Sequence, residues 1–156
     1  MANRFITSIY CDDVREEVGG KRSFIGVYAG QLIVQSAPAV LPKLCVIVII
    51  STPIDRPLTK CVIRILMDGD TLAEMPLEPR LLDESQNKLK AEPLPPDSEE
   101  PSIVLHAVAQ FSPFPITKEC KLRIRVQTED EELKGPALQI RVVAPINITP
   151  SSPPSA

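Results

Sequence analysis

The chain has 156 residues, of which 44% are hydrophobic and 24% are charged, and these values are typical of a folded domain with its own core. Its net charge of −3 argues against a dedicated nucleic-acid-binding protein, because such proteins usually carry an excess of Lys and Arg. A single histidine, His106, leaves few side chains for acid–base or nucleophilic chemistry, so we expect a protein that is not an enzyme and that has no cofactor.

The N-terminal residues do not combine a basic segment with an apolar one, so no signal peptide is predicted. The longest apolar run, residues 44–50, is too short to cross a bilayer as a helix. We therefore expect a cytoplasmic protein that does not bind membranes.

Four cysteines are spread along the chain without a C-x-x-C spacing, namely Cys11, Cys45, Cys61 and Cys120. Three of them lie in apolar runs, which favours small buried side chains in a reducing compartment. The spacing disfavours a zinc site, and we expect no metal, whereas a disulfide between any two of these cysteines stays open.

The first half of the chain contains six runs that are rich in β-branched and aromatic residues, at 5–11, 23–28, 31–34, 44–52, 60–67 and 71–75. Gly19 and Gly20 supply a turn between the first two runs. The run at 44–52 is continuous and mostly β-branched, which is typical of a central strand that is buried on both faces. Aspartates at 12, 13, 68 and 70 suggest calcium as an alternative, but we interpret them as residues of strand ends and turns.

Residues 76–102 have little strand character and are rich in proline. We predict a long loop there, in which residues 81–90 can form a short helix and residues 92–101 are extended and exposed. Strand character returns at 103–111. Residues 145–156 consist mainly of Pro and Ser and predict a disordered tail.

Apolar and polar residues alternate most clearly at 121–127 and 137–143, which predicts a hairpin with one buried face. The chain thus has about eight predicted strands and no long helix. We predict an all-β domain over residues 3–144, a two-layer antiparallel β-sandwich of the Ig-like or C2-like type, with the long Pro-rich loop at 76–102 and the tail at 145–156.

The alternation at 121–127 places cationic side chains on the outer face of the predicted hairpin. They are Lys121, Arg123, Arg125 and Arg141. Arginines that lie close together can hold phosphate or carboxylate groups through two hydrogen bonds each, so we predict this face as a contact for an anion or a partner. An acidic turn at 129–132 can neutralise part of the face.

Three local patterns resemble a family of small uncharacterised proteins from bacteria and from bacteriophages or prophages. They are residues 10–15 (YCDDVR) with 19–21 (GGK), residues 24–28 (FIGVY) and residues 41–44 (LPKL). In that family, the Gly-Lys turn joins the first two strands of a predicted β-sandwich. The resemblance implies this fold and a bacterial or phage origin, and it implies no activity.

Taken together, these features predict a non-enzymatic interaction or structural protein, encoded by a phage or prophage. It would bind a protein partner or assemble with itself through a sheet face, a sheet edge or the 76–102 loop. The alternative is an anionic ligand or nucleic acid on the face of Arg123, Arg125 and Arg141, although the few aromatic residues make nucleic acid unlikely. The expected location is the cytoplasm of a bacterial host, with the virion as the alternative.

Overall fold

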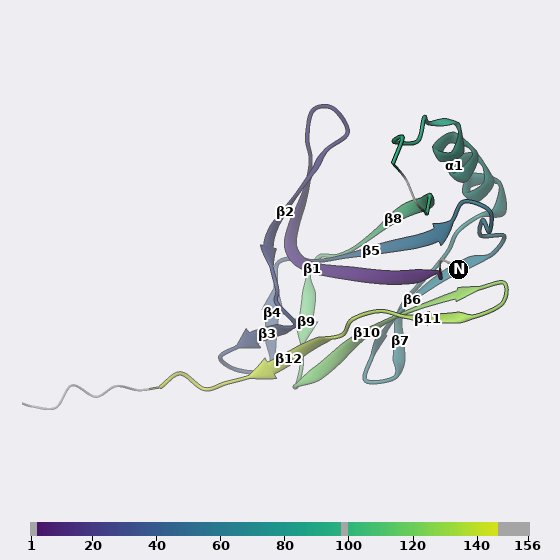
Figure 1. Cartoon of the computed structure of the whole chain (residues 1–156). Helices are drawn as coiled ribbons and strands as arrows, with labels where there is room; N and C mark the ends of the chain where they lie inside the picture. Colours follow the sequence, from purple (N-terminus) through teal and green to yellow (C-terminus); the bar gives the residue numbers. More distant parts are fainter. Residues whose placement is uncertain (1–2, 98–99, 147–156) are drawn as a thin grey trace, which may run out of the picture.

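The structure of the chain is a computed structural model, and it describes residues 3–97 and 100–146 (Figure 1). Strands dominate this part, as the sequence predicts, and they form two large sheets and one short pair. The short pair consists of β4 (Ala39–Leu41) and β9 (Phe114–Ile116). Within the described residues, no helix is long and apolar enough to span a membrane.

The first large sheet, called sheet A, has the strand order β2-β1-β5-β8, and all its neighbours are antiparallel. Its strands are β1 (Phe5–Glu16), β2 (Arg22–Val27), β5 (Leu44–Pro53) and β8 (Ser102–Phe111). Strand β5 lies between β1 and β8, and nearly all its residues are buried on both faces. This confirms the central strand that the β-branched run predicts.

The second large sheet, called sheet B, has the strand order β3-β12-β10-β6-β7, and β11 also pairs with β10. Its strands are β3 (Gln31–Val34), β6 (Cys61–Met67), β7 (Asp70–Pro76), β10 (Cys120–Thr128), β11 (Glu132–Lys134) and β12 (Leu138–Val142). The fully antiparallel arrangement predicted from the sequence is wrong at one place, because β3 and β12 run parallel.

The predicted hairpin of residues 121–127 and 137–143 is shorter than expected. Strand β12 pairs with β10 only from Cys120 to Leu122. From Arg125 to Gln127 the same edge of β10 pairs with β11 instead. The acidic turn thus leads into a separate short strand, β11, which the alternation of apolar and polar residues does not reveal.

The larger core cluster takes side chains from both large sheets. Val46, Val48 and Ile50 of β5 belong to it, and so do Leu122 and Ile124 of β10. Each fully buried aliphatic side chain contributes about 1.5–3 kcal/mol to folding. Because these residues alternate with outward-facing ones, each large sheet also presents an outer face.

Half of the predicted loop at 76–102 is a helix, α1 (Pro79–Ala91). Proline suits its first turn, where the backbone N–H groups have no partner within the helix. Leu82 and Gln86, four residues apart, form its buried face. The Gln86 side chain accepts a hydrogen bond from the N–H of Leu58 and donates one to its carbonyl, both at 2.8 Å. Residues 92–97, 100 and 101 have no helix or strand, and residues 147–156 of the predicted tail lie outside the described part.

A buried arginine joins three segments at one end of the molecule. Arg4 donates to Thr52 Oγ1 at 3.0 Å, to the carbonyl of Arg56 at 2.9 Å and to Asp130 at 2.9 Å, and it forms an ion pair with Glu129. The hydrogen bond from Arg56 is the largest of the causes that lower the pKa of Asp130. Burial raises the pKa of Glu129, but the hydrogen bonds it accepts lower it more, so the net shift is downward. The acidic turn is therefore organised by the buried Arg4 and the exposed Arg56.

Candidate functional site

The predicted cationic residues of β10 all lie on the outer face of sheet B. Lys121, Arg123 and Arg125 are half-buried there, and they alternate with fully buried residues of the same strand. Arg141 is exposed on the same face of β12. It lies beyond the end of β10, because Cys120 at the start of β10 pairs with Ile140. The structure therefore brings three of the four predicted residues together and leaves Arg141 at the margin.

Two further cations complete this face, and the sequence analysis missed both. Arg64 of β6 lies directly opposite Arg125, and Lys134 of β11 lies opposite Arg125 on its other side. Arg64, Arg125 and Lys134 thus form a row across three neighbouring strands, which we call the cationic row. Glu74 of β7 accepts a hydrogen bond from Arg64 at 2.7 Å, and Glu132 lies 3.8 Å from the Arg125 Nε.

The outer face of sheet A has the opposite character. The registers of β1, β5 and β8 place its outward-facing residues in four rows: Phe5–Ser51–Val104, Thr7–Ile49–His106, Ile9–Ile47–Val108 and Cys11–Cys45–Gln110. None of these positions holds Asp, Glu, Lys or Arg. We call this surface the apolar face.

One half of the apolar face is covered by the hairpin of β1 and β2. Val14 and Phe24 of the hairpin pack on Cys11, Cys45 and Ile47, whose exposed fractions are all 0%. Strand β1 contributes to both the sheet and the hairpin. Its residues up to Cys11 pair with β5, and the residues after Cys11 pair with β2 alone. Figure 1 shows the hairpin leaving sheet A in this way.

Contacts at the base of the hairpin hold it in place. Lys43 donates a hydrogen bond to Asp13 at 2.7 Å, and this bond is the largest cause that lowers the pKa of Asp13. Asp12 accepts a hydrogen bond from the Tyr28 hydroxyl. A Cβ atom at Gly26, whose φ is +67°, would lie 2.1 Å from the Asp12 carboxylate. Glycine is therefore required for the close approach of the two strands.

The other half of the apolar face is open. The exposed fractions of Phe5, Val104 and Val108 are 58%, 43% and 37%. A hollow of about 370 Å³ lies between the hairpin and β8, lined by Gly20, Arg22, Phe24 and His106.

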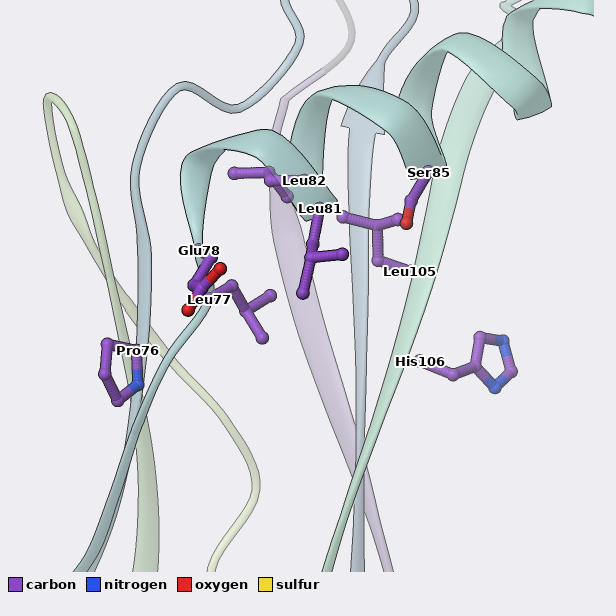
Figure 2. Close-up of a pocket in the computed structure, with 8 residues that line it drawn as sticks. All are labelled: Pro76, Leu77, Glu78, Leu81, Leu82, Ser85, Leu105 and His106. Carbon is purple, nitrogen blue, oxygen red and sulfur yellow. The ribbon is translucent and has the colours of Figure 1, made fainter.

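A second hollow, of about 280 Å³, separates β8 from α1. Leu77, Leu81 and Leu105 give it an apolar lining. Figure 2 shows Leu105 directed toward Leu81 and His106 on the opposite side of the strand. His106 therefore borders both hollows.

The described residues offer few groups for chemistry. All four cysteines are free and buried, although Cys11 lies opposite Cys45 in neighbouring strands. Burial raises the pKa of the Cys61 thiol to about 11, which disfavours the reactive thiolate. Asp68, one of the calcium candidates, accepts a hydrogen bond from the N–H of Lys121. No group of three or more His, Cys, Asp or Glu residues is arranged to hold a metal ion in this part of the chain.

Comparison with known protein families identifies the family of this chain. The model of DUF6941, a family of unknown function, matches residues 6–142, so the chain belongs to that family. The matched region contains both outer faces apart from Phe5. A search of curated proteins finds no match to this sequence.

Proposed function

We propose that this member of the DUF6941 family is a non-enzymatic interaction protein, and that it binds a protein partner through the open half of the apolar face. The observation that supports the proposal is the complete lack of charged residues on this face, although half of it is exposed. The buried centre of an interface between proteins is likewise depleted of charged residues.

The edge of sheet A adds a second means of contact. Strand β8 is one of the two outermost strands of sheet A, and none of its residues is charged or is proline. In sheet B, the outermost strand β7 carries Asp70, Glu74 and Pro76, which are residues that discourage pairing with another chain, and the other outermost strand, β3, has only four residues. Helix α1 lies beside the hollow at Leu105, so the part of β8 after His106 is the more open to a partner strand.

The more detailed predictions from the sequence, which concern the type of sandwich, the origin, the location and the partner, are part of the same proposal. Both large sheets contribute to one core, which supports a sandwich of the Ig-like or C2-like type. The phage or prophage origin rests on the resemblance alone. The proposed location is the bacterial cytoplasm, with the virion as the alternative. The proposed partner is a protein or a second copy of the chain, and not a membrane.

Affinity capture from the lysate of the natural host tests the proposal. The bait is the full chain, compared with Val104→Glu/Val108→Glu, whose new carboxylates would be desolvated in the interface. The matched control is Arg123→Gln on the outer face of sheet B. We expect the captured protein to be lost with the double variant and kept with the control.

Light scattering on the pure protein separates a partner from self-association. If the natural chain is a dimer and the double variant is a monomer, the partner is a second copy of the chain. If both variants capture the same proteins as the natural chain, and the chain is a monomer in each case, the proposal is wrong.

A further inference from the structure

We infer that the outer face of sheet B is a binding site for closely spaced phosphate groups, centred on the cationic row and on Arg123. This inference concerns the sheet opposite the proposed protein-binding face, so it does not depend on that proposal. It starts from the registers, which set Arg64 opposite Arg125 and Arg125 opposite Lys134. Like charges directly opposite each other in neighbouring strands destabilise a sheet.

The nearby acids compensate these charges only in part. Glu74 holds Arg64, but Glu132 lies 3.8 Å from Arg125, beyond hydrogen-bond distance. Among the described residues, neither Arg123 nor Lys134 forms an ion pair. A row of cations in a chain with a net charge of −3 is therefore an unbalanced local charge, and a bound anion would balance it.

The spacing suits an anion with several phosphate groups. Neighbouring strands lie about 4.8 Å apart, so the cationic row extends over roughly 10 Å. Arg123 adds a cation about 7 Å along β10 from Arg125, since the two residues are two positions apart in the strand. Guanidinium groups bind phosphate oxygens through paired hydrogen bonds, and lysine adds a point charge.

The neighbours of the row indicate that phosphate, and not a base, is recognised. Val62, Leu66, Gln127 and Glu132 occupy the adjacent outward positions, and none has a ring on which a base can stack. The shared chemistry of the ligand is thus the polyphosphate group, whether it belongs to a small molecule or to a nucleic-acid backbone.

The experiment measures binding of two probes to the full chain at 50 and 300 mM NaCl. Inorganic tripolyphosphate is measured by calorimetry, and a fluorescein-labelled oligodeoxythymidine is measured by anisotropy. The test variant is Arg125→Gln/Lys134→Gln, for which we expect affinity about ten times weaker, since each charge-assisted hydrogen bond is strong. Glu74→Gln frees Arg64, so we expect affinity about three times higher.

Lys88→Gln/Lys90→Gln on α1 is the matched control, because it removes two positive charges, as the test variant does, from exposed residues that lie outside sheet B. We expect less than a twofold change for it. Circular dichroism and thermal unfolding confirm that each variant is folded. Binding of tripolyphosphate alone identifies a small phosphorylated ligand, and tighter, steeply salt-dependent binding of the oligonucleotide identifies a nucleic-acid backbone.

Two results would overturn the inference. One is that neither probe binds at 50 mM salt. The other is that the test variant and Lys88→Gln/Lys90→Gln weaken binding by equal factors, which would show that only the total charge matters.

Discussion

The outer faces of the two large sheets differ although their inner faces are alike. Both sheets send aliphatic side chains into one core. On the outside, sheet A presents rows without a charged residue, and sheet B presents a row of three cations. Inward-facing residues are constrained by packing, whereas outward-facing residues are free to vary. The outward residues are therefore the ones that carry information about binding.

The largest effect should separate the covered and open halves of the apolar face. Ile47 and Val108 are neighbours in one row, but Ile47 is fully buried beneath the hairpin and Val108 is 37% exposed. Ile47→Asp should prevent folding, because an unpaired buried charge costs several kcal/mol. Val108→Asp should leave a folded protein. Soluble yield and circular dichroism check both, and equal behaviour of the two variants would remove the distinction between the halves.

The second effect contrasts a buried cation with a half-buried cation of sheet B. Arg4→Met should lower the free energy of unfolding by about 2–3 kcal/mol, because it leaves Glu129 without its ion-pair partner and Asp130 with Arg56 alone. Arg123→Met, the control on the outer face of sheet B, should change it by less than about 0.5 kcal/mol. Urea unfolding measures both values. A small loss for Arg4→Met would show that solvent replaces its contacts.

Acid should act through the same end of the molecule. The pKa values of Asp130 and Glu129 are lower in the folded chain than their ordinary values. Their stabilising contribution is therefore present above about pH 5 and is lost as the pH falls through the folded pKa values. The melting temperature should fall steeply below about pH 4. Because Arg4→Met removes one of the cations that lower these pKa values, the melting temperature of the variant should depend less steeply on pH. Parallel melting-temperature curves for the variant and the natural chain would contradict this explanation.

A smaller effect tests the cover of the apolar face directly. Phe24→Ala should cost about 1–2 kcal/mol, less than for a fully buried ring because Phe24 is half-buried. It should also speed the reaction of Cys11 and Cys45 with a thiol reagent, since both lie beneath the hairpin. Cys61 and Cys120 serve as internal controls. Equal acceleration at all four thiols would indicate global opening instead of local exposure.

The smallest effect concerns the cationic row. Lys134→Gln removes one like-charge pair, so it should stabilise the chain by about 0.2–0.5 kcal/mol or leave it unchanged. Thermal unfolding at low salt measures this change, which should shrink at high salt as charges are screened. A clear loss of stability would mean that Lys134 makes a favourable contact that outweighs the repulsion.

Local sequence patterns predict only the features that alternation and composition determine, such as a strand and the direction of its side chains. The β-branched run gives β5, and the alternation in β10 gives the outward direction of Arg123 and Arg125. The sequence predicts helix α1 only as an option within a loop, since prolines dominate the composition of the residues that flank the helix.

Pairing between distant strands is not encoded in such patterns. Arg64 becomes part of a site only because β6 pairs with β10 in one particular register. Arg4 is buried only because the acidic turn folds back over it. The lack of charge on the apolar face likewise emerges only when β1, β5 and β8 are aligned.

The parallel pairing of β3 with β12 bears on how the chain folds in time. This contact joins residues 31–34 to residues 139–142, and β12 pairs with β10 on its other edge. Sheet A similarly needs β8 from the second half of the chain. Neither sheet is complete until more than a hundred residues have left the ribosome. Such nonlocal topology predicts slow folding, in milliseconds to seconds, as one cooperative unit.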